Sequence, residues 1–233
     1  MSVSIIMPCY NEAAFIEKVV RNYYEAIISK ISDSELIVVD DCSHDNSLHI
    51  LNSLQTEYPK LKVLRTASNS GHGRAIRTGY ENATKKYIFQ VDSDDQFDAN
   101  DFWKFYDVRE DYDFVLGVRK DRSDPPERIV LSWVVNAANF LVFGIWMKDS
   151  NCPFRLMKKE ITDTYLKMIP NDAIAPNLML SLIAKKNRAK MLELPVSHFI
   201  RNGTPASSST WKLTKLALKG FTQLLKWRIP KEE

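Results

Sequence analysis

The sequence predicts an α/β domain whose central sheet is mostly parallel and carries helices on both faces. Short apolar runs rich in Val, Ile and Leu alternate with segments whose apolar residues recur at helical spacing, which is typical of that class. The 233 residues include 45% hydrophobic side chains, enough to bury a sizeable core, and the length fits one domain or one domain with an appendage. The apolar runs are residues 3–7, 36–39, 61–64, 87–91 and 114–118.

Helices are expected between and after these strands. Apolar residues recur every three or four positions between the first four runs, which predicts amphipathic helices. In the less regular second half we expect a helix within 172–186, an edge strand at 191–196 that contains Pro195, and a loop rich in Gly, Thr, Pro and Ser at 201–210. The first three helices are expected at 15–27, 48–58 and 75–83.

Charge and cysteine content exclude several classes of protein. A net charge of +3 is too small for a concentrated nucleic-acid-binding face, so we expect no nucleic-acid partner. Cys9, Cys42 and Cys152 are odd in number and far apart, which argues against a disulfide framework and a structural zinc site. The apolar start lacks a basic region and a cleavage site, so it predicts a strand and not an export signal. We therefore expect a cytoplasmic protein.

Residues 129–147 form a run of nineteen uncharged residues, close to the length that crosses a bilayer. Ser132, Asn136 and Asn139 interrupt the run at a spacing that puts them on one face of a helix. We interpret the run as an amphipathic helix, buried against the sheet or lying at a membrane surface, and not as a spanning segment.

Acidic residues follow several predicted strands, at the sheet edge where α/β proteins bind ligands. Asp92 and Asp94 flank one residue directly after the fourth strand, and Gln96 adds another oxygen. Oxygen ligands of this kind suit Mg²⁺ or Mn²⁺, and such a cation would hold phosphate oxygens. The alternative is an acidic turn that caps a helix beginning near Asp98.

A second acidic pair, Asp40 and Asp41, follows the second strand. Ser43 or Asp45 can cap the next helix, so part of this segment is a capping turn. Adjacent carboxylates at a partly buried strand end also repel each other unless a cation or a donor offsets them. Together with Asp92 and Asp94, they favour a shared polar ligand.

The segment 69–74 is glycine-rich and opens the third helix. A helix N-terminus carries partial positive charge, and Arg74 adds a guanidinium that suits phosphate. An ordinary loop-to-helix turn is the alternative.

Six motifs, in order, resemble the family 2 glycosyltransferases, and above all the branch of the dolichol- and polyprenyl-phosphate mannosyltransferases. The resemblance covers about residues 2–209. It implies a GT-A fold and transfer of a sugar from a nucleotide-sugar donor with inversion at the anomeric carbon. The motifs are SIIMPCYNE, ELIVVDDCSHDNS, NSGHGRAIRTGY, FQVDSDDQFDANDF, LGVRK and KDSNCPFRLMKKE.

The resemblance also implies roles for individual residues. Asp92, Asp94 and Gln96 match a D-x-D-x-Q motif that holds the metal. Arg119 matches the arginine of a G-S-R motif, although Val118 replaces its serine. The residues implied in nucleotide-sugar binding are Pro8, Tyr10, Glu12, Val39, Asp41, Asp92, Arg119 and Arg201, and Arg74 joins them through its place at the glycine-rich helix start.

Catalysis would depend on Asp94, Arg119 and, for one class of acceptor, Asp149. The departing diphosphate gains negative charge, which the cation, Arg119 and Arg201 would stabilise. A polyprenyl or dolichyl phosphate acceptor is already ionised and needs no base. A hydroxyl acceptor in polysaccharide or glycan synthesis needs one, and Asp149 is the candidate; otherwise it forms an ion pair with Lys148 or Arg155.

The sequence does not decide the identity of the acceptor, because it departs from the lipid-phosphate branch at several positions. Cys152 and Pro153 replace the usual Ser-Gly before Phe-Arg, and Ser207 stands where that branch has lysine.

We divide the chain into a catalytic domain, 1–209, and a basic amphipathic helix, 210–233. Lysines fall on one stripe of this tail and apolar or aromatic residues cover the rest, a composition typical of a lipid interface. We expect peripheral contact with the inner face of the membrane. The alternatives are packing on the domain or a contact between two copies of the chain.

Three other functions compete with a transferase. A phosphoryl-transfer enzyme with an aspartyl nucleophile would carry its D-x-D after the first strand, whereas here it follows the fourth. A receiver-like module would be about half as long. A silent binding protein would not need Asp92, Asp94, Gln96 and Arg119 together.

Overall fold

The computed structural model describes most of the chain. Some segments discussed above lie outside the described residues: the loop 201–210 with Arg201, the first part of the run 129–147, and the start of the tail. The described residues are 2–119, 140–199, 219–220, 222–227 and 229.

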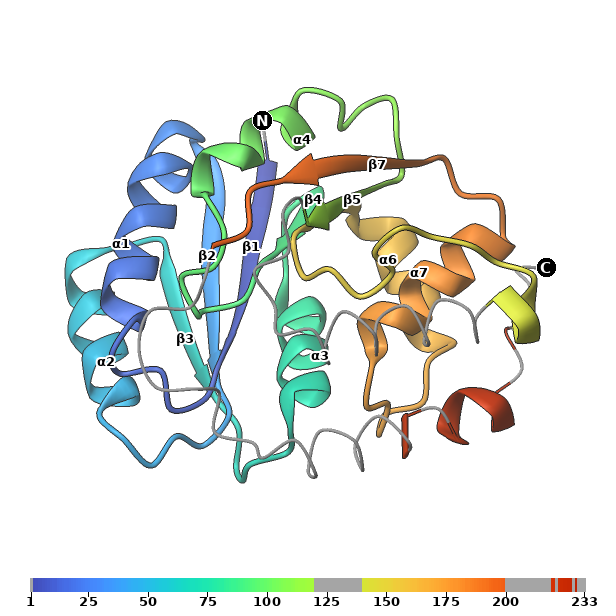
Figure 1. Ribbon diagram of the computed structural model, residues 1–233. Helices are drawn as coiled ribbons and strands as arrows, with labels where there is room; N and C mark the ends of the chain where they lie inside the picture. The colour runs from blue at the N-terminus through green and yellow to red at the C-terminus, as the bar shows by residue number, and fades with distance from the viewer. Residues whose placement is uncertain (1, 120–139, 200–218, 221, 228, 230–233) are drawn as a thin grey trace.

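In the described part of the chain, seven strands form one sheet in the order β3-β2-β1-β4-β6-β5-β7 (Figure 1). Among these seven, only β6 runs antiparallel to its neighbours, β4 and β5, and the other pairs are parallel. The mostly parallel sheet is thus confirmed. The strands are β1 Ser2–Cys9, β2 Asp33–Asp40, β3 Leu61–Arg65, β4 Tyr87–Gln90, β5 Phe114–Arg119, β6 Arg155–Lys158 and β7 Met191–Val196.

Helices cover both faces of the sheet, as predicted (Figure 1). One hydrophobic core lies under α1, α2 and α4, and a second lies under α3, α6 and α7. The helices are α1 Ile16–Ala26, α2 Ser47–Glu57, α3 His72–Asn82, α4 Phe102–Tyr106, α6 Lys159–Lys167 and α7 Pro176–Lys186, with short 3₁₀ turns η1 Ile28–Lys30 and η2 Ala99–Asp101.

Alternating side chains of each central strand enter the two cores. In β1, Ile5 and Met7 face the first core and Ile6 faces the second. Because both faces are buried, the strand is a continuous apolar run and does not alternate with polar residues. This burial explains why the central strands could be located from the sequence.

β6 was not predicted. It is four residues long and begins with Arg155, which is fully buried and donates to the carbonyl oxygens of Cys152 and Asn177. A charged residue at the start of a short segment gives no strand signal. The predicted edge strand β7 is confirmed, since among the described residues it pairs with β5 alone and can therefore accommodate Pro195.

The expectation of a helix reaching to the end of the run 129–147 is wrong. The described part is helical at 140–143 and ends at Gly144, which has a φ of +68°. Ile145 and Met147 then pack in the second core. Within the described residues, no helix combines the length and the apolar character that crossing a bilayer requires.

The tail segment, residues 219–220 and 222–227, lies against the domain. Leu224 is buried in the second core and Trp227 packs at its margin. The Trp227 Nε1 atom donates to the Met168 carbonyl oxygen at 3.2 Å. Of the alternatives considered for the tail, packing on the domain therefore applies to this segment.

Candidate active site

The carboxyl ends of β1, β2, β4 and β5 meet at one edge of the sheet because these strands are mutually parallel. Asn11, Cys42 and Asp95 follow β1, β2 and β4, and they have φ values of 54°, 60° and 60°. Non-glycine residues adopt this left-handed conformation rarely, and such residues concentrate at functional sites. The backbone thus turns sharply where the sequence predicts ligand binding.

Beyond β4 and β5 lies a cavity of about 210 Å³. Asp92, Asp94, Gln96 and Arg119 all line it, so the fold brings together the residues predicted around a metal and a diphosphate. The Asp92 side chain is 27% exposed, and its Oδ1 lies 3.7 Å from His72 Nε2. We name this space the metal-site cavity.

Carboxylate and amide oxygens, such as those of Asp92, Asp94 and Gln96, are the kind of ligand that Mg²⁺ and Mn²⁺ prefer. Gln96 donates through Nε2 to the Phe199 carbonyl oxygen at 3.0 Å, which leaves its amide oxygen for a ligand. Among the described residues, no group of three or more His, Cys, Asp and Glu side chains is arranged to hold a metal alone. Asp92 and Asp94 would therefore share the cation with diphosphate oxygens.

Helix capping was the alternative explanation for this acidic turn, and the residue that caps is Asp98. The Asp98 carboxylate accepts from the Asn100 backbone N–H at 2.9 Å and so caps η2. Asp92 and Asp94 precede this cap and face the cavity instead.

Gln90 orients Asp92 and was missed by the sequence reasoning. Its buried amide oxygen accepts from the Tyr80 hydroxyl at 3.1 Å and from Asn177 Nδ2 at 2.7 Å, and its Nε2 donates to Asp92 Oδ1 at 3.4 Å. Burial raises the pKa of Tyr80, so the hydroxyl stays protonated and can donate. A glutamine inside an apolar strand that is buried on both faces was the available signal.

Arg119 forms a two-point ion pair with Asp149. Arg119 Nε lies 2.7 Å from Asp149 Oδ2, and Nη2 lies 3.0 Å from Oδ1. We expected Asp149, if structural, to pair with Lys148 or Arg155, and that expectation is corrected by its pairing with Arg119. Arg155 instead donates to carbonyl oxygens. Asp149 is buried and does not line the metal-site cavity.

Asp41, after β2, is occupied by the protein's own donors. It accepts from Thr66 Oγ1 at 2.8 Å, from Ser70 N and Oγ at 3.0 and 2.9 Å, and from Gly71 N at 2.7 Å. Burial alone would raise the pKa of Asp41, but the hydrogen bonds from Ser70, Thr66 and Gly71 outweigh it and lower the pKa. The carboxylate thus holds the turn that begins α3.

Its neighbour Asp40 is also paired within the chain. One oxygen lies 3.5 Å from Arg65 Nε, and both oxygens accept weakly from the Ser43 backbone N–H. The expectation that Ser43 or Asp45 is the N-cap of α2 is wrong, since Asn46 holds that position without a side-chain hydrogen bond; Asp45, one residue earlier, accepts from Ser47 N at 2.9 Å. Asp40 and Asp41 do not line the metal-site cavity, so a ligand shared by both acidic strand ends would have to extend beyond it.

The other predicted nucleotide-binding residues lie along β1 and β2. Pro8 and Val39 are partners in the sheet register, and Val39 is fully buried in the second core. Tyr10 and Glu12 are partly exposed after β1, and the Tyr10 ring meets His44 edge-on at 6.4 Å. Tyr10 and Glu12, but not the Val39 side chain, are thus open to a ligand.

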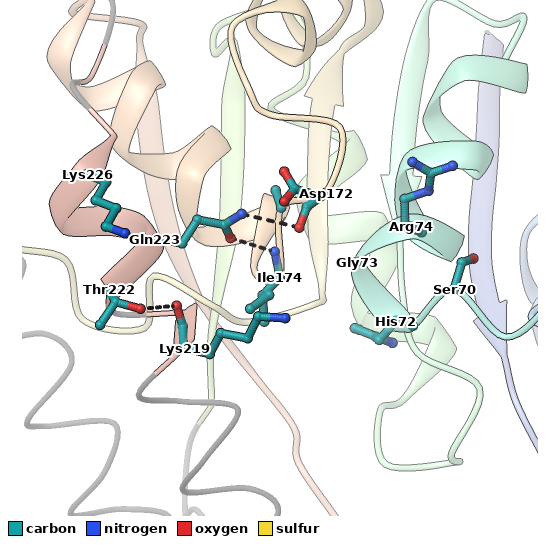
Figure 2. A pocket seen from close by; sticks show the side chains of 12 residues that line it. Ser70, His72, Gly73, Arg74, Asp172, Ile174, Lys219, Thr222, Gln223 and Lys226 are labelled. Atoms are coloured by element: carbon teal, nitrogen blue, oxygen red, sulfur yellow. Dashed lines mark hydrogen bonds between the residues drawn. The ribbon is translucent and has the colours of Figure 1, made fainter.

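A second cavity, of about 690 Å³, separates the start of α3 from the tail segment (Figure 2). Arg74 lines it and donates to the Asn171 carbonyl oxygen at 3.3 Å. Lys219 and Lys226 line the opposite wall. We name this space the cationic cavity.

Comparisons with known proteins identify the family to which the chain is similar. The sequence profile of glycosyl transferase family 2 matches residues 4–166. An undecaprenyl-phosphate 4-deoxy-4-formamido-L-arabinose transferase of Sodalis glossinidius (strain morsitans) is 28% identical over 217 residues. The match covers 92% of this chain and 65% of that protein, so the chain spans about two thirds of the relative's length.

Solved structures share the fold. Glucosyl-3-phosphoglycerate synthase from Mycobacterium tuberculosis, in complex with Mn²⁺, UDP and glucosyl-3-phosphoglycerate, has a TM-score of 0.72 at 15% identity; the match covers 98% of this chain and 81% of that one. A mannosyltransferase from Pyrobaculum calidifontis with GDP-Man and Mn²⁺ has a TM-score of 0.66 at 20% identity, with coverage of 98% and 65%. With its GT-A fold, its clustered strand-end residues and the profile match, the chain belongs to glycosyl transferase family 2.

Proposed function

We propose that this glycosyltransferase moves a hexose from a nucleotide sugar, GDP-mannose or a UDP-hexose, to a polyprenyl or dolichyl phosphate. The observation that carries the proposal is the meeting of Asp92, Asp94, Gln96 and Arg119 in one cavity. The relative from Sodalis is named for an undecaprenyl-phosphate acceptor, and two structural neighbours contain Mn²⁺ with a nucleotide or nucleotide sugar.

In the proposed reaction, Asp92, Asp94 and Gln96 would hold Mg²⁺ or Mn²⁺, and the bound ion would supply positive charge that stabilises the departing diphosphate. Arg119 adds a fixed positive charge, because its pairing with Asp149 holds the guanidinium in one orientation. Gln90 holds Asp92 toward the metal.

The pairing of Asp149 also bears on the acceptor. Asp149 already accepts two hydrogen bonds from the Arg119 guanidinium, and it lies outside the lining of the metal-site cavity. An ionised phosphate acceptor needs no base, which favours it over a hydroxyl. Asp149 then acts as a positioning residue for Arg119.

The donor's nucleotide would lie across the ends of β1 and β2. Pro8, Tyr10 and Glu12 would line its pocket, and the β2 end with Val39 and Asp41 would lie near the base and ribose. Arg74, from the start of α3, and Arg201 would add positive charge on the phosphate side.

We further propose that the catalytic domain, 1–209, sits peripherally on the inner face of the membrane, with the tail 210–233 in contact with lipid. Phe140, Leu141 and Trp146 are exposed, Leu141 at 82%. Their segment and the tail segment both pack on the second core, and Leu225 of the tail segment is exposed as well. Such groups beside lysines suit a lipid interface.

The test is transfer of radiolabelled sugar from GDP-mannose and UDP-glucose to a short polyprenyl phosphate, or to a glycan with free hydroxyls, with and without Mn²⁺. We expect Mn²⁺-dependent transfer to the phosphate, which Asp94→Ala abolishes. Transfer to the glycan alone would support the hydroxyl acceptor. Absence of turnover with every donor, acceptor and metal, in folded protein, would refute the proposal and leave a silent binding protein or the remote D-x-D phosphoryl-transfer alternative.

A further inference from the structure

The cationic cavity adjoins the metal-site cavity, and the two share His72 and Ile174 in their walls. One wall is the start of α3 and the other is the tail segment (Figure 2). Gly73 allows the start of α3 to approach the loop that precedes α7, since a Cβ there would lie 2.5 Å from the Ala173 carbonyl oxygen. A group bound in the cationic cavity would thus lie next to the proposed donor.

Specific contacts fix which face of the tail segment lines the cavity. Gln223 Oε1 accepts from the Ile174 backbone N–H at 3.0 Å, and its Nε2 donates to the Asp172 carbonyl oxygen at 3.3 Å. Lys219 and Lys226 both line the cavity. Figure 2 shows Lys219 extending from the tail segment toward α3.

The lining carries more positive than negative charge. The residues that line the cavity include three cationic side chains, those of Arg74, Lys219 and Lys226, and one carboxylate, that of Asp172. Neither lysine forms an ion pair with any residue in the described part of the chain. Cations gathered around a cavity repel one another unless an anion offsets them, so the cavity favours a ligand of high negative charge.

We infer that the cationic cavity binds the phosphate group of the acceptor, an inference that rests on the proposed function. Lys219 and Lys226 contact the phosphate oxygens through their charged amino groups. One phosphate oxygen then attacks the anomeric carbon of the donor in the neighbouring cavity. The bond from that carbon to the diphosphate breaks, and the nucleoside diphosphate leaves with the electron pair. No proton transfer is needed.

The test compares the full chain with a double variant, Lys219→Gln with Lys226→Gln. The acceptor is farnesyl phosphate, which is short enough to remove the need for a membrane. At saturating donor and Mn²⁺ we expect its KM to rise about tenfold or more, since two charge-assisted contacts are lost, while the KM for the donor stays the same. The matched control, Lys185→Gln with Lys186→Gln, changes two lysines at the end of α7 that line neither cavity and should leave both KM values unchanged.

Other outcomes would overturn the inference. An unchanged KM for farnesyl phosphate refutes it. A raised KM for the donor instead assigns the lysines to the donor diphosphate. Loss of binding to phosphatidylglycerol vesicles without a change in the KM for farnesyl phosphate assigns them to lipid headgroups.

A binding experiment separates this inference from the proposed function. Calorimetry with farnesyl phosphate and with farnesol measures the contribution of the phosphate directly. If wild type binds farnesyl phosphate but not farnesol, and the double variant loses that preference, the cavity is a phosphate site even if no transfer occurs. If wild type transfers sugar to farnesyl phosphate and the variant binds it equally well, the inference fails while the proposed function stands.

Discussion

The acidic ends of β2 and β4 look alike in the sequence and differ in the structure. After β2, Asp41 accepts four hydrogen bonds from Thr66, Ser70 and Gly71 and so holds a turn. After β4, Asp92 and Asp94 line a cavity with Arg119. A carboxylate surrounded by the protein's own donors supports the fold, and one that faces a cavity is available to a ligand.

The largest expected effect comes from the β4 end. Asp92→Asn should lower Mn²⁺-dependent turnover by about 100-fold or more, because it removes a charged ligand of the cation. Asparagine keeps the oxygen that accepts from Gln90, so the melting temperature should not change. Transfer assays across a Mn²⁺ titration, with a thermal melt as control, measure both. Wild-type turnover in the variant would contradict the assignment of Asp92 to the metal.

The β2 end should respond in the opposite way. Asp41→Asn can still accept from Ser70, but its amide nitrogen would face the Gly71 N–H, and two donors cannot pair. We expect the free energy of unfolding to fall by about 1–3 kcal/mol in urea titrations. Asp92→Asn is the matched control, and equal stability of both variants would remove the distinction between the two strand ends.

A smaller effect should appear in the dependence of stability on pH. Asp41 has a lower pKa in the folded chain than the ordinary value of 3.8, so its stabilising contribution is present above that value. It is lost as the pH falls below about 3.8 and through the folded pKa. Urea unfolding of Asp41→Asn from pH 6 to pH 3 should therefore show a shallower loss than wild type. Parallel curves would show that Asp41 does not titrate as described.

The smallest effect concerns the thiols near the strand ends. Burial raises the pKa of Cys9 to about 12, aided by Asp40 and Glu12, and burial raises the pKa of Cys152 to about 12. Cys42 is partly exposed. A thiol reagent should label one cysteine rapidly in native protein and three in urea, as mass spectrometry would detect. Rapid labelling of Cys9 would mean that the β1 end opens more readily than its burial indicates.

Much of the site was predictable because it depends on strand ends. The apolar runs before Asp92 and Arg119 located those residues at one edge of a parallel sheet. The resemblance to a family supplied the match for Gln96. Gln90 was missed because its role depends on Tyr80 and Asn177, which approach it only when α3 and α7 pack on the sheet.

By itself, the sequence determined the parallel strands, the covering helices and the residues that a parallel sheet brings to one edge, because periodicity and burial follow from local spacing. The tertiary structure alone decided the pairing of Arg119 with Asp149, the internal use of Asp41 and the place of β6 within the sheet. These features depend on which residues, distant in the sequence, come close to a given carboxylate or strand in the folded chain. The local spacing of residues does not specify such long-range contacts.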